Sequence, residues 1–526
     1  MPRFIDKASE KWYNNISVRE IFVRPPLSVV TSEECTMFYQ STRSEHWVNS
    51  LQAILEGIAP DGGLYLPVDL SSVKVDPADL ADKSFEEMAT VILHTLFDEF
   101  SESEMADMVR RAYGGKFETE DVTPTVKVGQ DYVLELFRGP TSAFKDVALS
   151  MLPVLITEAK KKLGIREKIM ILTATSGDTG KAALEGFHDV DGTGIIVFYP
   201  NGGVSAVQKA QMVTQVGKNV TVCAIEGNFD DAQTGVKNTF ASCAKMDLTQ
   251  YGVRLSSANS INIGRLAPQI VYYYKSYCDL VAAGEIAMGD SVSFVVPTGN
   301  FGDILAGYFA KCMGLPVARL VCASNENDVL TEFLTTGRYD RRRVFHRTNS
   351  PSMDILVSSN LERMLYLASH GDCVKIAGYM KALNEIGEYT VDDALLAELK
   401  KTFFAGCCSQ NETLAAIGRT YETYGYLCDT HTAVAVDVAA AYKKTEPAEK
   451  VVILSTASPY KFPVAVLTAL GETPDEDEFR VMEQLHERTG VPIPAALAEL
   501  KEKKVLHTDV IPKDSILDYV LKKVEG

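Results

Sequence analysis

The chain is 526 residues long and carries a formal net charge of −18 at pH 7. Apolar residues make up 46% of it and charged residues 23%, which is ordinary for a globular protein of about three domains. The negative charge argues against nucleic acid or an anionic membrane surface as a partner, because both would repel the chain. An anionic ligand would therefore need a local site lined by basic groups or by N–H groups.

Cysteine usage and hydropathy indicate the compartment. Ten cysteines are scattered along the chain, without the Cys-x-x-Cys or Cys/His spacing of a zinc site. The first residues contain no apolar run typical of a signal peptide. No stretch reaches the roughly 20 apolar residues that a membrane span needs. We therefore expect free thiols in a reducing cytoplasm, with no bound metal and no membrane.

Seven apolar runs predict strands. Most are continuous stretches of Val, Ile and Leu, as expected of strands buried on both faces. Helix-like segments lie between several of them, which is the β-α-β pattern of a parallel sheet. The predicted strands are residues 132–137, 168–174, 194–199, 219–225, 292–297, 319–323 and 451–455.

The last part of the chain is predicted to be mainly helical. Residues 390–425 and 435–444 have helical patterns. Asp392 and Asp393 suit a helix N-terminus, because the helix dipole favours negative charge there. From about residue 474 the tail is charged and helical in pattern, which predicts a solvated cap on the core.

A lysine follows the first predicted strand. The strand stops at Gly139-Pro140, and Lys145 then stands among small and apolar residues where a helix would start. Burial disfavours the ammonium and lowers its pKa, which frees the amine to attack a carbonyl carbon. A lysine pointing to water is the alternative, and it would be the default for a lone lysine.

Two further strand-to-helix turns are rich in glycine. One spans residues 175–180 and the other residues 299–303. Glycines let the backbone approach a ligand, and the free N–H groups at a helix start attract an anion. Ala182 after the Gly-Lys pair excludes a Walker A loop in the first turn, and the glycine spacing of the second is not that of a Rossmann fingerprint. A capped turn without a ligand remains the alternative for each.

Together the lysine and the two turns suggest a cofactor that forms a Schiff base and carries a phosphate. Pyridoxal 5'-phosphate has an aldehyde for the lysine, a phosphate for one turn and an electron-withdrawing ring. The other turn would then hold a carboxylate or phosphate of the substrate. All three features follow predicted strands, at the edge where open α/β sheets bind ligands.

Several segments together resemble the threonine synthase family, of the longer bacterial and fungal kind. The resemblance runs in order from about Met37 to past residue 470, which is most of the chain. Besides the three features above, it is carried by Ser41–Arg43, Ile58–Tyr65, Asn259–Asn262 with Arg265, Ser350–Ile355, Ser359–Arg363 and Ser455–Pro463.

The resemblance implies the fold of type II pyridoxal-phosphate enzymes, which is similar to the tryptophan synthase β subunit. This is an α/β fold with two open, mostly parallel twisted-sheet lobes and the cofactor between them. An amino-terminal domain and a helical carboxyl-terminal cap are added. Residues 1–36 precede the family-like start, and one hypothesis is that they are a non-native extension. The implied domains are 37–125 (amino-terminal), 126–160 with 285–473 (large, cofactor-binding), 161–284 (smaller, substrate-binding) and 474–526 (cap).

Threonine synthases convert O-phospho-L-homoserine and water into L-threonine and phosphate, the last step of threonine biosynthesis. The chemistry stabilises a carbanion at two carbons in turn, eliminates phosphate and adds water, with pyridoxal phosphate as the electron sink. By resemblance, Lys145 bonds to the cofactor and then moves protons as general acid and base. Asp178 would contact the ring hydroxyl, and Thr456 the pyridine nitrogen. The cofactor phosphate would be held by Gly299, Asn300, Phe301, Gly302 and Asp303.

Two groups of residues match the family's substrate contacts. Arg265 fits its role chemically, because a planar guanidinium can pair with two phosphate oxygens. The substrate carboxylate would be held by Thr175, Ser176 and Thr179, and the substrate phosphate by Asn259, Ser260 and Arg265.

Some positions depart from the family pattern or stay outside the predicted site. Arg138 and Ser458 stand where the family usually or often has His, and Ser44 stands where Gly is common. These departures leave details near the lysine and the ring open. Lys181 is interpreted as a solvated helix-face lysine, and His431 as a packed histidine.

Other functions remain possible from sequence. The nearest is another pyridoxal-phosphate enzyme of the same fold, namely a phospho-lyase acting on O-phosphothreonine or O-phosphoserine, or a dehydratase. A nucleotide-dependent phosphotransferase and a non-catalytic ligand-binding relative are more distant. The family includes dimers and monomers, so either state is expected.

Overall fold

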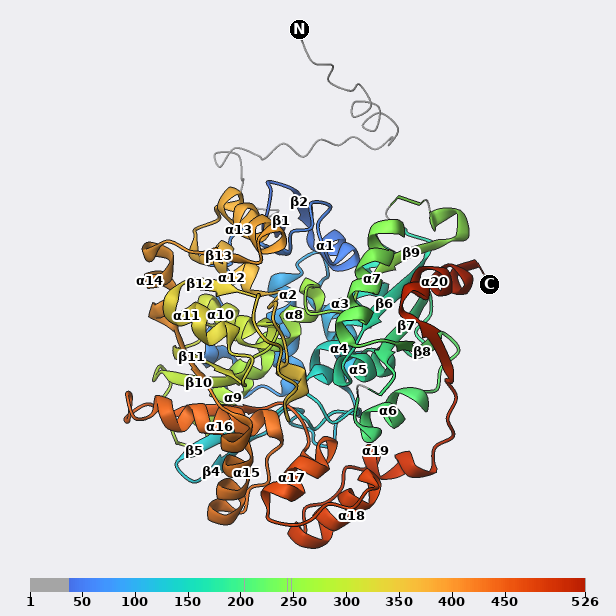
Figure 1. The fold of residues 1–526 in the computed structure, drawn as a ribbon. Coiled ribbons are helices and arrows are strands. Elements are labelled where there is room, and N and C mark those ends of the chain that lie inside the picture. The colour runs from blue at the N-terminus through green and yellow to red at the C-terminus, as the bar shows by residue number, and fades with distance from the viewer. Residues whose placement is uncertain (1–36, 203, 244, 247, 526) are drawn as a thin grey trace. The chain divides into compact units, whose positions relative to one another are not determined.

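Two helix-flanked sheets organise residues 37–525 (Figure 1). The computed structural model describes these residues apart from 203, 244 and 247. The hypothesis of a non-native extension at residues 1–36 lies outside the described residues.

The larger sheet has six strands in the order β14-β11-β10-β15-β5-β4. Neighbours run parallel except β4, which is antiparallel to β5. Both faces are covered: Val295 of β10 clusters with Val434 of α16 (Thr430–Tyr442), while Phe294 and Val296 belong to the main core. This burial explains the continuous apolar runs in the sequence. The strands are β4 Thr125–Val128, β5 Asp131–Glu135, β10 Val292–Pro297, β11 Val317–Ser324, β14 Phe403–Cys407 and β15 Val451–Ser455.

The smaller sheet has five strands, all parallel, in the order β16-β8-β7-β6-β9. Leu172 of β6 clusters with residues of α7 (Phe229–Cys243) and α20 (Ile516–Glu525) on one face. Ile171, on the other face, joins the core that includes residues of α5 (Asp178–Phe187). The strands are β6 Lys168–Ala174, β7 Thr193–Pro200, β8 Val220–Glu226, β9 Val253–Ser256 and β16 Asp509–Pro512.

An amino-terminal domain holds the loop that follows β9. Its three strands form an antiparallel sheet in the order β2-β1-β3. The Ser256 hydroxyl donates to the Leu55 carbonyl at 3.0 Å, and the Asn262 side-chain amide donates to the Ile54 carbonyl at 2.9 Å. The domain thereby fixes both ends of residues 256–262. Its elements are β1 Phe38–Ser41, β2 Trp47–Asn49, β3 Tyr65–Pro67, α1 Ser50–Glu56, α2 Phe85–Leu96 and α3 Glu102–Tyr113.

The other helices connect these layers. α5 follows β6 and α10 follows β10, so both helices begin at the carboxyl ends of parallel strands. A hairpin of β12 (Arg338–Asp340) and β13 (Glu388–Thr390) lies outside both sheets. The helices are α4 Lys145–Lys162, α6 Ala206–Val213, α8 Ile263–Leu266, α9 Ile270–Ala282, α10 Gly302–Met313, α11 Val329–Thr336, α12 Leu361–Ala368, α13 Cys373–Glu385, α14 Asp393–Thr402, α15 Gln410–Tyr424, α17 Pro463–Ala469, α18 Glu478–Thr489 and α19 Ala495–Ala498.

The predicted strands and the two-lobed, mostly parallel arrangement are confirmed, but the helix predicted over 390–425 is wrong in its middle. Residues 403–407 form β14, the edge strand of the larger sheet, with Phe403 opposite Leu320. A short apolar run fits a helix or a strand equally well by periodicity, and pairing with β11 decides here. α16 begins at Thr430 rather than at residue 435, because the Asp429 side chain caps it.

The tail is helical in α18 and α20, as predicted, and it also supplies a strand. β16 pairs in parallel with β8 at the edge of the smaller sheet. Ile516 and Val520 of α20 are buried in the cluster on one face of that sheet. The tail is therefore part of the smaller sheet's core as well as a cap.

The structure also shows the state of the cysteines and the character of the helices. Nine cysteines lie in the described part of the chain, and all nine are free thiols. Within that part, no helix combines the length and the apolar character needed to cross a bilayer.

Candidate active site

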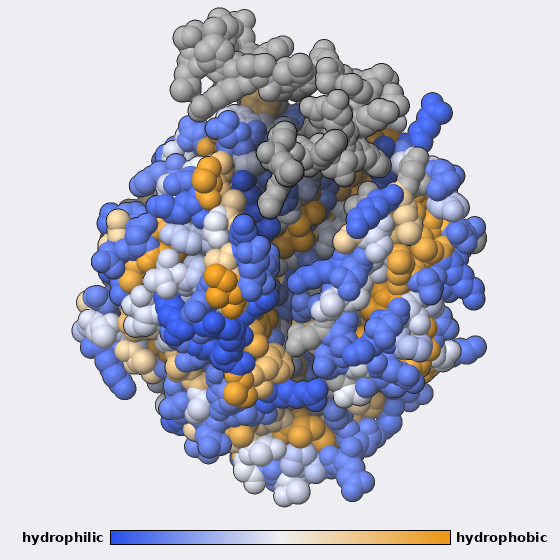
Figure 2. All heavy atoms as spheres, turned by 45° about the horizontal axis from the view of Figure 1, so that its top comes forward, coloured by the Kyte–Doolittle hydropathy of each residue, from blue (hydrophilic) through white to orange (hydrophobic). Residues whose placement is uncertain are grey.

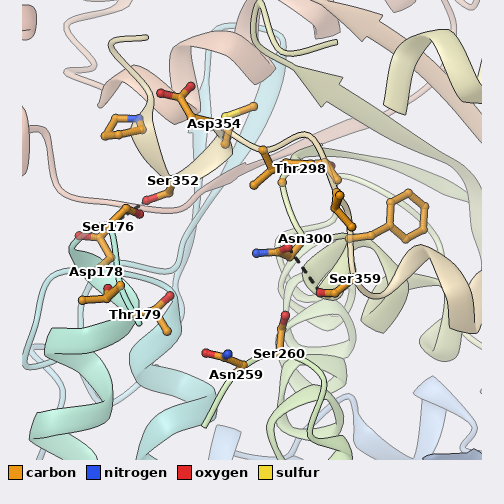
Figure 3. Close-up of a pocket in the computed structure, with 18 of the residues that line it drawn as sticks. Ser176, Asp178, Thr179, Asn259, Ser260, Thr298, Asn300, Ser352, Asp354 and Ser359 are labelled. Atoms are coloured by element: carbon orange, nitrogen blue, oxygen red, sulfur yellow. Dashed lines mark hydrogen bonds between the residues drawn. The ribbon is translucent and has the colours of Figure 1, made fainter. Parts of the chain in front are cut away.

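A cavity of about 570 Å³ lies at the carboxyl ends of strands from both sheets. The surface is hollowed between the two lobes on the face shown in Figure 2. Every residue predicted to bind the cofactor or the substrate lines this cavity. Figure 3 shows Ser176 and Thr179 of the smaller lobe across from Thr298 and Asn300 of the larger lobe.

Lys145 is the first residue of α4 and its side chain is buried. The Phe144 N–H donates to the Thr456 carbonyl at 2.8 Å, which fixes the start of the helix beside the end of β15. Burial lowers the pKa of Lys145 to about 8, against the attraction of Asp178 and with help from the charge of Arg265. The amine is thus half deprotonated near pH 8, where an ordinary lysine is almost fully charged, so more of it is available as a nucleophile.

Residues 299–303 form an anion-binding turn at the start of α10. Phe301 has φ +61°, and α10 has no side-chain cap at its N-terminus. The Gly299 carbonyl accepts a hydrogen bond of 2.8 Å from the Ser358 hydroxyl, and the Asn300 carbonyl accepts one of 3.0 Å from the Asn360 N–H. The first N–H groups of α10 therefore remain available to a phosphate.

Two members of this turn have specific constraints. A Cβ at Gly299 would lie 2.9 Å from the carbonyl oxygen of Ser352, so only glycine fits without a shift. The Asp303 carboxylate accepts hydrogen bonds from the hydroxyls of Tyr272 and Tyr273, at 2.5 and 2.9 Å. Burial raises the pKa of Asp303 to about 6, against these hydrogen bonds. Asp303 can therefore contribute its N–H to an anion site, but its carboxylate would repel a phosphate.

The other glycine turn is shaped by Thr175. Its hydroxyl accepts hydrogen bonds from the N–H groups of Gly177 and Gly180 at 2.9 and 2.8 Å, and donates to the Gly177 carbonyl at 3.1 Å. Gly177 has φ +139°, a conformation that favours glycine. The Thr175 hydroxyl is thus committed to the turn. Ser176 and Thr179 line the cavity beside it.

Asp178 lies between the lobes at the start of α5. Its carboxylate accepts a hydrogen bond of 2.9 Å from Gln208 and one of 3.3 Å from the hydroxyl of Ser352. Lys461 is ion-paired with it at 2.7 Å. Burial alone would raise the pKa of Asp178, but the charges of Lys461 and Lys145 outweigh burial and hold it well below the usual range.

The loop after β9 brings three predicted residues to the opposite wall. Asn259 and Ser260 line the cavity, and the buried Arg265 donates to the Ala258 carbonyl at 2.7 Å. Burial lowers the pKa of Arg265 to about 10, which leaves the guanidinium charged at neutral pH. A buried charged guanidinium at a cavity wall suits a phosphate or a carboxylate.

The positions outside the predicted site have separate explanations. His431 lines the cavity and is packed: its Nδ1 is 2.8 Å from Asp429 Oδ1, and its Nε2 accepts from the Ser352 N–H at 3.1 Å. Lys181 is not solvated as interpreted, because its side chain is mostly buried and paired with Glu185 at 2.8 Å. Neither Arg138 nor Ser458 is among the cavity-lining residues.

Sequence reasoning missed some cavity residues. Lys237 of α7 and Arg341, which follows β12, line the cavity, and no sequence motif marked them. Lys461 lies in the family-like segment Ser455–Pro463, but the resemblance predicted no function for its side chain. Its neighbours Tyr460 and Phe462 gave no signal that the lysine is fully buried.

Comparison with known proteins identifies the family. Three family models match in order: "Threonine synthase N terminus" at residues 38–113, "Pyridoxal-phosphate dependent enzyme" at 123–379 and "Threonine synthase, C-terminal" at 432–513. A threonine synthase from Pseudomonas aeruginosa is 39% identical over 443 residues, which are 83% of this chain and 92% of the relative. The chain belongs to the threonine synthase family. Its cofactor is therefore pyridoxal phosphate.

Solved structures support the same assignment. The pyridoxal-phosphate-bound threonine synthase of Brucella melitensis has a TM-score of 0.81 and 38% identity, covering 93% of this chain and 99% of its own. Yeast threonine synthase has a TM-score of 0.82 and 32% identity, covering 94% and 99%. Human "Threonine synthase-like 1" is 40% identical over 434 residues, which are 80% of this chain, but the chain spans only 58% of that relative's length.

The cavity residues fit the family's cofactor. Lys145 supplies a buried amine with a lowered pKa, as an aldehyde requires. The start of α10 supplies uncapped N–H groups, and the close contact at Gly299 keeps the turn free of a side chain. These donors match an aldehyde and a phosphate on one small molecule.

Proposed function

We propose that the protein is a threonine synthase, which converts O-phospho-L-homoserine and water into L-threonine and phosphate. One observation carries the proposal. The buried amine of Lys145, the anion turn at residues 299–303 and the buried guanidinium of Arg265 line a single cavity. The cavity thus offers one phosphate site for the cofactor and a second for a phosphorylated substrate.

The division of labour follows from these groups. When bound, pyridoxal phosphate supplies the electron sink for the carbanions of the reaction. Lys145, released from the cofactor, would carry protons on Nζ, because its lowered pKa lets it act as acid and as base. Thr456, which follows β15, would present a neutral hydroxyl to the pyridine nitrogen and would therefore not hold it protonated. Asp178 would contact the ring hydroxyl.

Substrate recognition is proposed for the two remaining walls. Ser176 and Thr179 would hold the substrate carboxylate, within a turn that Thr175 shapes. Arg265 would hold the substrate phosphate, and it would keep the released phosphate nearby while water adds. Asn259 and Ser260 complete this clamp on the loop that the amino-terminal domain fixes.

The deciding experiment compares substrates and products. Purified protein loaded with pyridoxal phosphate is given O-phospho-L-homoserine, O-phosphothreonine or O-phosphoserine in separate reactions. We expect L-threonine and phosphate from the first substrate. Formation of 2-oxobutyrate from O-phosphothreonine, without threonine from phosphohomoserine, would instead show a phospho-lyase. Borohydride reduction should add the cofactor's mass at Lys145, and Lys145→Ala should abolish both this adduct and turnover.

The domain limits, compartment and assembly remain part of the proposal. The two main sheets support lobes at 126–160 with 285–473 and at 161–284. The larger sheet takes its strands from the first two ranges, with β4 beginning one residue earlier, and the smaller sheet takes its strands from the third, with β16 added from the tail. We expect a cytoplasmic enzyme that is a monomer or a dimer. Light scattering of the purified protein would settle its assembly.

A further inference from the structure

Asp178 lies between two lysines from the other lobe. Its Oδ1 is 2.7 Å from Nζ of Lys461, and its Oδ2 is 4.0 Å from Nζ of Lys145. Lys461 ends the 3-10 helix η5 (Pro459–Lys461), and its side chain is completely buried. It also donates to the Thr141 carbonyl at 3.0 Å. One carboxylate therefore faces two ammonium groups and forms its short contact with only one of them.

This geometry matters for the reactive amine. A carboxylate in direct contact with Lys145 would stabilise its ammonium form, and the amine would then be a poor nucleophile at neutral pH. In the structure, the other partners of Asp178 are Gln208 and Ser352. Together with Lys461 they hold the carboxylate where it is.

We propose that Lys461 is a positioning residue whose ammonium holds and neutralises the Asp178 carboxylate, so that Lys145 stays free to bond with the cofactor. The inference rests on the proposed role of Lys145 as the cofactor-binding amine. Lys461 acts through Asp178 and through its own charge.

The charged groups around Lys145 determine in which direction its pKa changes when Lys461 is lost. Lys145 is influenced by Asp178 of α5, Arg265 of α8, Asp303 of α10 and Lys461 of η5. Burial lowers the pKa of Lys145, and the charges of Arg265 and Lys461 act in the same direction, whereas Asp178 and Asp303 oppose them. Loss of Lys461 removes one repelling cation and also frees the Asp178 carboxylate to pair with Lys145. Both changes raise the pH at which the amine becomes reactive.

A second group also faces Lys461. This group is the buried Asp146. Burial raises the pKa of Asp146 to about 6, and the charge of Lys461 opposes this rise. Asp146, in the first turn of α4, accepts hydrogen bonds from the Thr141 N–H and hydroxyl, so it is tied to the loop before α4. Loss of Lys461 would favour the protonated form of Asp146, and at neutral pH this effect is expected to be small beside the change at Asp178.

The test is a double-mutant cycle on the full-length protein freed of cofactor. Wild type, Lys461→Met, Asp178→Asn and the double variant are acetylated with trace acetic anhydride over a range of pH values. Mass spectrometry then gives the midpoint of Lys145 reactivity for each protein. Lys461→Met should raise the midpoint by about one pH unit or more, because an unmasked carboxylate typically shifts a neighbour by that amount. Asp178→Asn should lower it, and in that background Lys461→Met should have a much smaller effect.

A purely structural role predicts a different result. If Lys461 only connects the loop at Thr141 to α5, its loss lowers the stability of the protein. Any change in the pH midpoint of Lys145 reactivity is then the same in the wild-type background and in the Asp178→Asn background. Equal effects in the two backgrounds overturn the proposal. Lys461→Gln replaces Lys461→Met if circular dichroism shows that the methionine variant does not fold. Lys443→Met removes a lysine that pairs with Asp131 at 2.6 Å and serves as the matched control with an unchanged midpoint.

The cycle is independent of turnover. If the two substitutions interact as expected but no threonine is formed, only the proposed function is refuted. If threonine is formed but Lys461→Met has equal effects in the two backgrounds, only the proposed role of Lys461 is refuted.

Discussion

Arg363 donates a hydrogen bond of 2.9 Å from Nε to the carbonyl oxygen of Tyr65, a residue 298 positions earlier in the chain. The same buried guanidinium donates to the Asn360 side chain at 2.6 Å and to the Ile261 carbonyl at 2.5 Å. Burial lowers the pKa of Arg363 to about 9. One side chain thus joins the amino-terminal domain, α12 and the loop that carries Ser260.

Replacing this arginine tests that junction. Arg363→Met leaves the carbonyls of Tyr65 and Ile261 without their donor, and each buried unpaired group costs about 1–3 kcal/mol. We expect the free energy of unfolding to fall by about 3 kcal/mol, and KM for phosphohomoserine to rise because the loop shifts. Urea denaturation and steady-state kinetics measure the two effects. Arg419→Met is the control, since Arg419 is 59% exposed and pairs with Asp437 at the surface. Equal effects of the two substitutions would contradict the prediction.

Arg265→Ala separates a binding role from a role in turnover. If the guanidinium holds the substrate phosphate and then the released phosphate, its loss should lower kcat as well as raise KM. We expect kcat/KM to fall at least 100-fold, since a charge-assisted hydrogen bond contributes about 1.5–3 kcal/mol and a guanidinium can form two. Arg254→Ala is the control, because Arg254 pairs with Glu167 at the surface of the same lobe. An unchanged kcat with only a raised KM would limit Arg265 to binding.

The sequence predicted the sheets better than the elements at their edges. Continuous apolar runs marked β6, β10 and β15 because both faces of these strands are buried. The edge strand β16 has no such run, and the short apolar run of β14 fits a helix equally well. Pairing with β8 and β11 decides the conformation of these two strands.

The predicted site residues came together because each follows a strand whose carboxyl end meets the same cavity. What the sequence could not predict is the partner of each side chain. Nothing local marks the Thr175 hydroxyl as bound to Gly180, or Asp178 as paired with Lys461. The first contact depends on the exact backbone conformation of the turn, and the second on how two segments far apart in the chain are packed, so only the structure shows them.

Gly299→Ala tests the phosphate turn. An added methyl group would meet the Ser352 carbonyl oxygen at 2.9 Å, and backbone cannot move away as a side chain can. The turn should shift and bind the cofactor phosphate more weakly, so we expect the Kd for pyridoxal phosphate to rise at least 10-fold. Fluorescence titration of the cofactor-free protein measures this. Gly378→Ala is the matched control, because a Cβ at Gly378 in α13 meets no atom within 4 Å. An unchanged Kd for pyridoxal phosphate in Gly299→Ala would mean that the turn accommodates a methyl group, which would contradict the prediction.

Asp303 should make stability depend on pH. Burial raises the pKa of Asp303 from 3.8 to about 6, so between these values the folded protein binds more protons at this group than the unfolded chain does. Its contribution therefore lowers the free energy of unfolding as pH rises from about 4 to about 6, by about 2–3 kcal/mol. Asp303→Asn keeps an oxygen for the Tyr272 and Tyr273 hydroxyls but cannot ionise. We expect the variant to gain stability relative to wild type as pH rises across this window, which urea denaturation at several pH values measures. Glu476→Gln is the control: Glu476 is exposed, so this variant should follow the wild-type dependence of unfolding free energy on pH. Parallel curves for Asp303→Asn and wild type would contradict the prediction, because they would show that the Asp303 carboxyl group ionises as in the unfolded chain.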